Sequence, residues 1–184
     1  EVARVAQAKA LRFDGSDAAD DALVAAALSD RTRFAAIYER YRLPVYRYVR
    51  ARGADEDTAI DVVAGTFERA MVALPTYRPR GGGLGAWLFR IARNAWIDEG
   101  RRRARTAELT LVADRPDRGG LGRDPDLHVA LRQLPAEAQE AVALRYAGGL
   151  TAAEIGVMLG KRPATVQKLI ERSLDTLKEA LDDR

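Results

Sequence analysis

The stretch TAAEIGVMLGKRPATVQKLIERS, residues 151–173, decides how the C-terminal part of this 184-residue chain folds. Thr151 and Glu154 stand three residues apart, so each side chain can bond the free backbone N–H of the other at the start of a helix. Gly160 can adopt the left-handed conformation that ends a helix, and Pro163 fits the first turn of the next one. The spacing therefore predicts a helix-turn-helix.

The second helix of this motif has an apolar face and a polar face. Small or apolar side chains at three- and four-residue spacing form the packing face, which comprises Val166, Ile170, Ser173 and Leu177. Side chains on the other face can reach into a major groove, and the basic turn before the helix can hold phosphates. The candidate DNA contacts are Lys161, Arg162, Thr165, Gln167, Lys168, Glu171 and Arg172. A plain helical bundle with a solvated charged face is the alternative interpretation.

The rest of the chain also has the periodicity of helices. Apolar residues recur at three- and four-residue spacing, and strand-like alternation is missing. We therefore predict an all-α fold with two small helical domains joined by a flexible linker. The linker covers residues 106–126, where a polar, glycine-rich run has nothing periodic to bury. It separates a domain at 19–105 from the helix-turn-helix domain at 127–184, and residues 1–18 form an N-terminal extension.

Three amphipathic stretches are expected in the first domain. They cover residues 34–48, 60–74 and about 84–103, with Ile60 as the first apolar residue of the second stretch. That stretch should stop before Pro75, because the residue that precedes a proline disfavours helix.

The third stretch separates into two faces when it is drawn as a helix. One face is apolar and consists of Leu88, Ile91, Ala92 and Ala95. The other face consists of Arg90, Asn94, Ile97 and Arg101. An arginine-rich run at 101–105 follows, which suits contact with a phosphate backbone. A solvated helix end that merely complements the helix dipole is the alternative.

Aromatic side chains accompany these arginines. Aromatics mixed with arginines can hold unstacked bases against ring faces and guanidinium planes. Core packing is the default for Phe89 and Trp96, whereas Tyr77 belongs to a loop where we expect less burial. The candidate residues of a single-stranded DNA site are Tyr77, Trp87, Arg90, Arg93, Asn94, Arg101 and Arg102.

Composition excludes several classes of function. The chain has no cysteine and one histidine, His128, which excludes disulfides, thiolate metal sites and a histidine metal cluster. It has no glycine-rich phosphate loop and no nucleophile beside a base, so we predict neither an enzyme nor a cofactor. A net charge of +3 and a pI near 9.4 point to a phosphate-bearing partner. We expect a cytoplasmic protein without membrane insertion, because no apolar run approaches the length of a membrane span.

Three segments carry a likeness to a known family. They are DVVAGTFERA at 61–70, YRPR at 77–80 with AWLFRIARNAWID at 86–98, and residues 134–166. Together they resemble the extracytoplasmic-function (ECF) group of sigma-70-family sigma factors. The first segment is similar to the part of region 2 that docks on RNA polymerase. The second resembles the part that melts and reads the minus-10 element, and the third resembles region 4, which reads the minus-35 element.

This resemblance implies an alternative sigma factor that directs promoter-specific transcription initiation. The implied partners are the β′ clamp and β flap of core RNA polymerase, promoter DNA and an anti-sigma factor. Carried over by position, Asn94 would contact an extruded minus-10 base, with Tyr77 beside the capturing loop. The residues implied in polymerase docking are Asp61, Val62, Phe67 and Arg69.

Two helices depart from the family pattern. Many relatives have a Gln-Glu pair where this chain has Ala64-Gly65, and a glycine inside a helix costs about 0.5–1 kcal/mol relative to alanine. Relatives often have an Arg-Ser-Arg cluster where this chain has Gln167-Lys168-Leu169. Two alternatives therefore stay open: a helix-turn-helix regulator that acts without core polymerase, and a sigma-like protein that works mainly through a protein partner.

Overall fold

The computed structural model describes residues 17–79, 81–110 and 125–182. Every regular element in these ranges is a helix, which confirms the predicted all-α class. Residues 1–16 of the predicted extension and 111–124 of the predicted linker lie outside the described residues. In chain order the elements are α2 (Asp17–Ser29), η1 (Arg31–Arg33), α3 (Phe34–Ala51), α4 (Glu56–Ala73), η2 (Leu74–Thr76), α5 (Gly83–Thr110), α6 (Pro125–Gln133), α7 (Ala136–Val142), η3 (Ala143–Ala147), α8 (Ala152–Leu159) and α9 (Pro163–Asp182).

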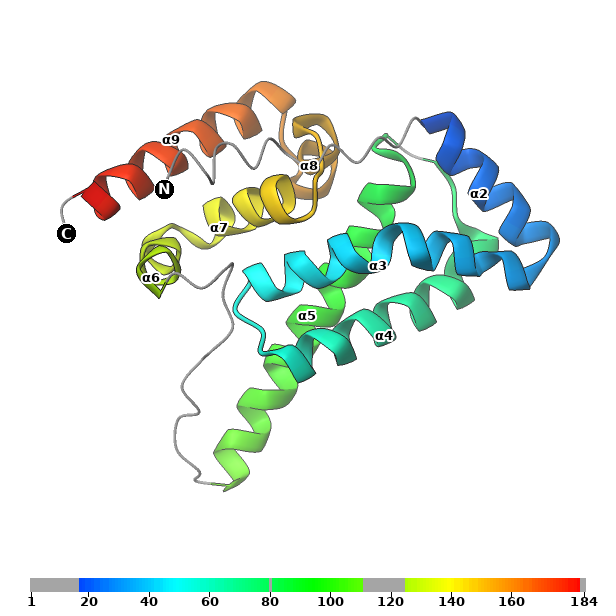
Figure 1. Ribbon diagram of the computed structural model, residues 1–184, viewed down its shortest axis with the longest axis horizontal. Coiled ribbons are helices and arrows are strands. Elements are labelled where there is room, and N and C mark those ends of the chain that lie inside the picture. Colours follow the sequence, from blue (N-terminus) through cyan, green and yellow to red (C-terminus); the bar gives the residue numbers. More distant parts are fainter. Residues whose placement is uncertain (1–16, 80, 111–124, 183–184) are drawn as a thin grey trace.

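The N-terminal domain is built from α2 to α5 (Figure 1). The inward face of α3 carries Ile37, Tyr41, Val45 and Tyr48, which recur at helical spacing. Helix α4 packs against both α3 and α5. It starts at the N-cap Asp55, whose carboxylate accepts a hydrogen bond from the backbone N–H of Thr58 at 2.8 Å. As predicted, α4 ends before Pro75, which lies in η2.

One apolar position of α4 differs from the prediction. Ile60 was expected on the packing face with Val63 and Phe67, yet its side chain is 54% exposed while the other two are buried. Ile60 and Phe67 are seven residues apart and therefore only about 20° apart around the helix axis, so both lie at the margin of the buried face of α4 and periodicity alone does not separate them.

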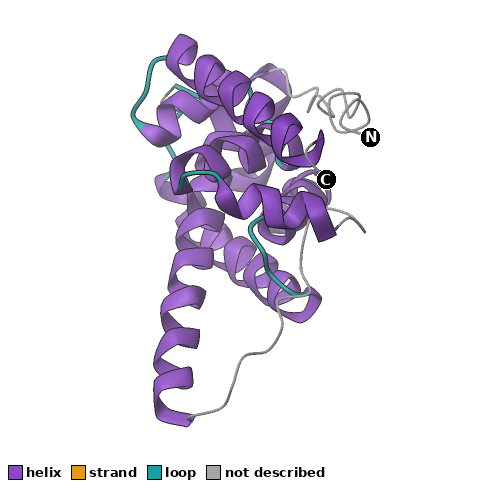
Figure 2. Cartoon of the chain, turned by 90° about the vertical axis from the view of Figure 1, so that its left-hand side faces the viewer, coloured by secondary structure: helices purple, strands orange, loops and turns teal. Residues whose placement is uncertain are grey.

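Helix α5 is the longest element, with 28 residues. It continues through residues 106–110, the start of the predicted linker, and α6 begins at Pro125, just before the predicted end of that linker. Residues 107–109 are Ala-Glu-Leu, which are strong helix formers, so local propensity extends the helix. The C-terminal turns of α5 project away from the other helices (Figures 1 and 2).

The C-terminal domain contains the predicted helix-turn-helix, formed by α8 and α9. Thr151 is the N-cap of α8, and its side chain and that of Glu154 form the predicted capping box. Gly160 ends α8 with a φ of 67°, in the left-handed region. The predicted packing face of α9 is buried. A small cluster joins α6, α7 and α9 and includes Leu127, Leu131, Leu134, Val142 and Leu177.

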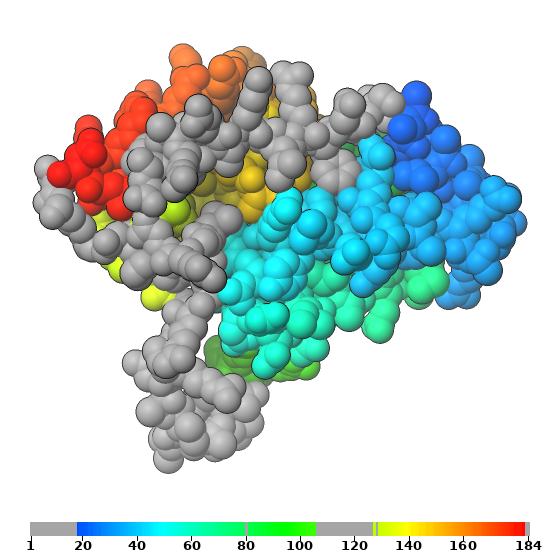
Figure 3. Space-filling view, viewed as in Figure 1, coloured from blue at the N-terminus to red at the C-terminus, as the bar shows by residue number. Residues whose placement is uncertain are grey.

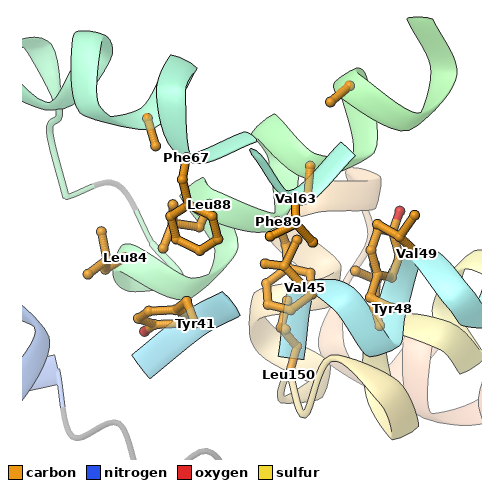
Figure 4. Close-up of a cluster of buried hydrophobic side chains, with 14 of the residues drawn as sticks. Tyr41, Val45, Tyr48, Val49, Val63, Phe67, Leu84, Leu88, Phe89 and Leu150 are labelled. Atoms are coloured by element: carbon orange, nitrogen blue, oxygen red, sulfur yellow. The ribbon is translucent and has the colours of Figure 1, made fainter. Parts of the chain in front are cut away.

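The two domains also share one apolar core. Side chains of the C-terminal domain join the cluster that fills the N-terminal domain; they include Leu144, Leu150, Ile155 and Val166. Figure 4 shows Leu150 entering the group formed by Val45, Tyr48 and Phe89. In the space-filling view the surface of α3 adjoins that of the α7 and η3 segment (Figure 3). The sequence predicts two domains but not this shared core.

Candidate nucleic-acid interface

Two polar side chains occupy the outer face of α5. Arg90 and Asn94 are exposed and stand one turn apart, whereas Leu88, Phe89 and Ala92 are buried. This arrangement agrees with the two faces expected from the sequence. A guanidinium beside an amide offers several hydrogen-bond donors and one carbonyl acceptor, which suits phosphates and base edges.

Arg93 points toward the C-terminal domain. Its side chain is 39% exposed, and its Nε lies 3.6 Å from Oε1 of Glu140 on α7. Arg90 and Arg93 therefore play different parts in this structure, although both belong to the candidate set. One faces solvent and the other forms an ion pair between the domains.

Tyr77 is buried, which corrects the expectation that its loop would leave it accessible. Its residue is 7% exposed, and its ring meets that of Trp87 edge to face, with centroids 5.0 Å apart and planes at 60°. Aromatic pairs in this geometry attract each other beyond the effect of buried area. The loop position misled the prediction because α5 brings the half-buried Trp87 against it.

The basic end of α5 is exposed and internally paired. Arg101 Nη1 lies 3.8 Å from Asp98 Oδ1. Glu99 pairs with Arg102 at 2.7 Å and with Arg103 at 3.1 Å. Exposed pairs of this kind contribute about 0–1 kcal/mol, so a phosphate backbone can displace them.

The outer face of α9 is open to solvent. Its exposed side chains are Thr165, Gln167, Lys168, Glu171 and Arg172. In the preceding turn Arg162 is exposed, while Lys161 Nζ lies 3.1 Å from Glu137 Oε1. Among the residues that the structure describes, neither Lys168 nor Arg172 is part of an ion pair. This helix therefore offers its polar groups without first breaking an internal contact.

Helix α4 contains the residues that the resemblance assigns to docking, and their solvent exposure divides them into two groups. Asp61 and Arg69 are exposed. Val62 and Phe67 are 5% and 4% exposed, so they pack α4 against the hydrophobic core and do not form its exposed surface. The ring of Phe67 packs edge-on against Tyr38, with centroids 4.9 Å apart.

Sequence reasoning missed two surface residues of the same helix. Ile60 and Val72 are 54% and 74% exposed, and they lie in different parts of the surface of α4, since twelve residues separate them by about 120° around the helix and about 18 Å along it. For Val72, an apolar residue outside the main stripe of an amphipathic helix, the sequence carries such a signal; for Ile60, which belongs to the predicted stripe, it does not.

Sequence reasoning also missed Glu140, which is a buried carboxylate between the domains. It is 5% exposed and accepts a hydrogen bond from the Tyr48 hydroxyl at 2.6 Å. Burial, followed by the charge of Glu140, raises the pKa of the Tyr48 phenol well above its ordinary value. Nothing in the periodicity of α7 marks this residue, because its partners lie on another domain.

The described residues contain no group of three or more histidine, cysteine or carboxylate side chains that could hold a metal ion. Within the same ranges, no helix has the length and apolar character required to cross a membrane.

Comparison with known proteins decides the family. The description "Sigma-70 region 2" matches residues 37–106, and "Sigma-70, region 4" matches residues 125–177. The ECF RNA polymerase sigma factor SigD of Mycobacterium tuberculosis is 33% identical over 181 residues, which cover 88% of this chain and 83% of that protein. The chain belongs to the ECF sigma factors of the sigma-70 family. Region 2 thus corresponds to α3, α4 and most of α5, and region 4 to α6 through α9.

Other ECF sigma factors differ in how much of their length is matched. SigL of Mycobacterium tuberculosis is 31% identical over 171 residues, covering 86% of this chain and 94% of that protein. BldN of Streptomyces coelicolor is 32% identical over 161 residues, covering 82% of this chain but 61% of that protein. This ECF sigma factor therefore spans about three fifths of BldN.

Solved structures share the fold. CnrH in complex with the cytosolic domain of CnrY superposes with a TM-score of 0.68 at 29% identity, covering 90% of this chain and 98% of that one. The sigma factor RpoE from Bartonella quintana, in complex with the anti-sigma factor NepR, gives a TM-score of 0.58 at 28% identity, covering 78% of this chain and 94% of that one.

Proposed function

We propose that this ECF sigma factor binds core RNA polymerase and directs it to promoters that carry minus-10 and minus-35 elements. One observation carries the proposal: the chain presents two separate exposed polar helix faces, one in the region 2 domain and one on a helix-turn-helix. Arg90 and Asn94 form the first, and the exposed side of α9 forms the second. Two DNA sites in one chain suit a promoter with two spaced elements.

The α5 face is the proposed minus-10 site. Extruding a base from the duplex costs a few kcal/mol, so a site that offsets this cost only for the correct base gains selectivity without ATP. The Asn94 amide can hydrogen-bond to a base edge, and Arg90 can hold the adjoining phosphate. Trp87 is half buried and backed by the buried Tyr77, which fixes the ring that borders the site.

The α9 face is the proposed minus-35 site. Gln167 and Arg172 are residue types that read adenine and guanine edges in the major groove. Lys168 and Arg162 supply charge for phosphates, and Thr165 lies in the first turn of the helix. The capping box of α8 and the left-handed Gly160 set the angle at which α9 is presented.

The outward face of α4 is the proposed docking site for the β′ clamp of core polymerase. It combines the exposed Asp61 and Arg69 with the exposed apolar side chains of Ile60 and Val72. Exposed apolar side chains with charged neighbours are typical of protein interfaces. The region 4 domain would contact the β flap.

An anti-sigma factor is the proposed regulator. RpoE from Bartonella quintana, which shares this fold at 28% identity, is solved with the anti-sigma factor NepR. We expect this chain to work in the cytoplasm, where polymerase and chromosome are located.

Run-off transcription with bacterial core polymerase and a library of genomic promoters tests the proposal. We expect transcripts from promoters with two spaced elements only when both core and this protein are present. Ile60→Asp should abolish most of the core binding because it places a charge at an exposed apolar position of the proposed docking site. Val129→Asp is the matched control, since Val129 is also exposed, at 42%, but lies on α6. Tight duplex binding without any core complex would contradict the proposal and favour a conventional regulator.

A further inference from the structure

Glu140 lies buried where the two domains meet, and three groups of the N-terminal domain converge on it. The hydroxyl of Tyr48 donates a hydrogen bond to Oε1 at 2.6 Å. The Nε atoms of Arg52 and Arg93 lie 3.4 Å and 3.6 Å from its two carboxylate oxygens. One carboxylate of the region 4 domain thus connects α3, the residue after α3, and α5.

The burial of this carboxylate depends on those partners. A buried charge without partners is costly, and the Glu140 side chain is only 6% exposed. Separation of the domains would leave Glu140 on one side and both arginines on the other, where water or an anion can reach them. The contact is therefore stable only while the domains stay together.

The two ion pairs are poised to be exchanged. The Nε atoms of Arg52 and Arg93 are buried and make no hydrogen bond in the structure, so each of these atoms faces Glu140 as a charge without an aligned hydrogen bond. A phosphate offers more acceptor oxygens and can satisfy a guanidinium with aligned hydrogen bonds. A nucleic-acid backbone that reaches these arginines can compete with the carboxylate.

The surrounding apolar contact is specific enough to hold a closed state. The ring of Phe89 packs edge-on against Tyr48, with centroids 5.5 Å apart. The same ring lies close to Gly148 of the region 4 domain, where an added Cβ would come within 2.8 Å of a ring carbon and of the Leu144 carbonyl oxygen. A glycine is required at this place for the domains to approach so closely.

We propose that Glu140 is an intramolecular latch: it occupies Arg52 and Arg93 as a promoter phosphate would, and it keeps the free protein closed until DNA or core polymerase displaces it. The latch rests on the proposed function, because Arg93 adjoins the proposed minus-10 site. It restrains Arg93 beside that site, while Arg90, Asn94 and the reading face of α9 stay exposed. Contact of single-stranded DNA with Arg52 and Arg93 should therefore require release of Glu140, whereas contact through the exposed Arg90 and Asn94, and duplex contact through α9, should not.

Glu140→Gln tests the latch, because it keeps the shape of the side chain and removes its charge. Glu137→Gln is the matched control: Glu137 lies one turn earlier on α7, is exposed, and pairs with Lys161 of its own domain. The full chain has no cysteine, so single cysteines at the exposed positions Asp57 and Glu179 can carry a fluorophore pair that reports domain separation. Affinity for a mixed-sequence single-stranded DNA is measured on the same proteins.

We expect Glu140→Gln to lower the energy-transfer efficiency and to tighten single-strand binding about fivefold or more. Its salt dependence should steepen by about 0.7 in log–log slope for each arginine that gains a phosphate. Glu137→Gln should match the wild type in both measurements. Gly148→Ala is a second variant, whose Cβ would meet Phe89 across the interface and the Leu144 carbonyl oxygen of its own domain, each at 2.8 Å; where circular dichroism shows wild-type helix content, it should give the same direction of change with Glu140 intact.

Two results would overturn the latch. One is a folded Glu140→Gln protein with unchanged transfer efficiency and unchanged affinity. The other is opening without any gain in single-strand affinity, since closure would then not restrain Arg93. Core-dependent transcription by the wild type distinguishes failure of the latch from failure of the proposed function. If the wild type transcribes with core while Glu140→Gln behaves like it throughout, the latch alone fails; if neither protein transcribes, the proposed function fails.

Discussion

Helices α5 and α9, which both face DNA in the proposed function, are held very differently. On α5, Arg93 pairs with Glu140 of the other domain and Phe89 is fixed in the shared core. On α9, the outer face is exposed, and within the described ranges neither Lys168 nor Arg172 forms an ion pair. The comparison shows that packing of the two domains holds Arg93 and Phe89 of α5, whereas Arg90, Asn94 and the outer face of α9 stay accessible.

The largest effect should come from removing the ring by which α5 meets the second domain. Phe89→Ala should lower the free energy of unfolding by about 3–5 kcal/mol, because a fully buried aromatic side chain leaves a cavity. Urea unfolding followed by circular dichroism measures the change. Leu43→Ala, at a position 45% exposed on α3, is the control and should cost far less. Equal costs for the two variants would show that Phe89 does not join the domains.

The next effect concerns the exposed stripe of α5. Asn94→Ala should reduce the population of open promoter complexes by about 2–3 kcal/mol, or more than tenfold, because a base contact is lost. Stability and core binding should not change, since the side chain is exposed. Fluorescence of 2-aminopurine placed in the minus-10 element reports opening, and Gln133→Ala on α6 is the control. Normal opening by Asn94→Ala would remove this residue from the proposed site.

On α9 the expected effect is smaller and limited to duplex binding. Arg172→Ala should weaken binding to a minus-35 duplex by about 1–2 kcal/mol and relax the preference at one base position. Lys178→Ala serves as the control, because it removes an exposed cation two turns further along the same helix. Quantitative gel shifts measure both. If both variants lose affinity equally for every sequence, Arg172 contacts only phosphate.

The smallest effect sharpens the role of α4. Gly65→Ala should stabilise the protein by about 0.5–1 kcal/mol, because a Cβ at this position meets no atom within 4 Å and alanine favours the helix. Thermal unfolding measures the gain. Affinity for core polymerase should stay the same or increase, and a loss of that affinity would show that the polymerase approaches the bare backbone at Gly65.

Local features of the chain were predictable from sequence because they depend on neighbouring residues. The capping box at Thr151 and Glu154, the left-handed Gly160 and the packing face of α9 all agree with the structure. The stripe with Arg90 and Asn94 on α5 agrees as well, since it follows from helical periodicity alone.

Features that depend on distant contacts were not predictable. Tyr77 is buried because Trp87, ten residues away, packs against it, and Ile60 is exposed although it belongs to the predicted packing stripe of α4. Glu140 looks like an ordinary surface glutamate until Tyr48, which is 92 residues earlier in the chain, is placed beside it. The sequence pattern does not indicate which surfaces of the two domains pack against each other.

Permanganate reactivity of promoter thymines tests whether α5 and α9 act together on one promoter DNA. With core polymerase, this protein and a promoter that carries both elements, thymines of the minus-10 element should become reactive. Reactivity should fall when either Asn94 or Arg172 is replaced by alanine, and it should be absent without core. Thymines that react without core polymerase, or that never react with it, would contradict the assignment of α5 and α9 to one initiating complex.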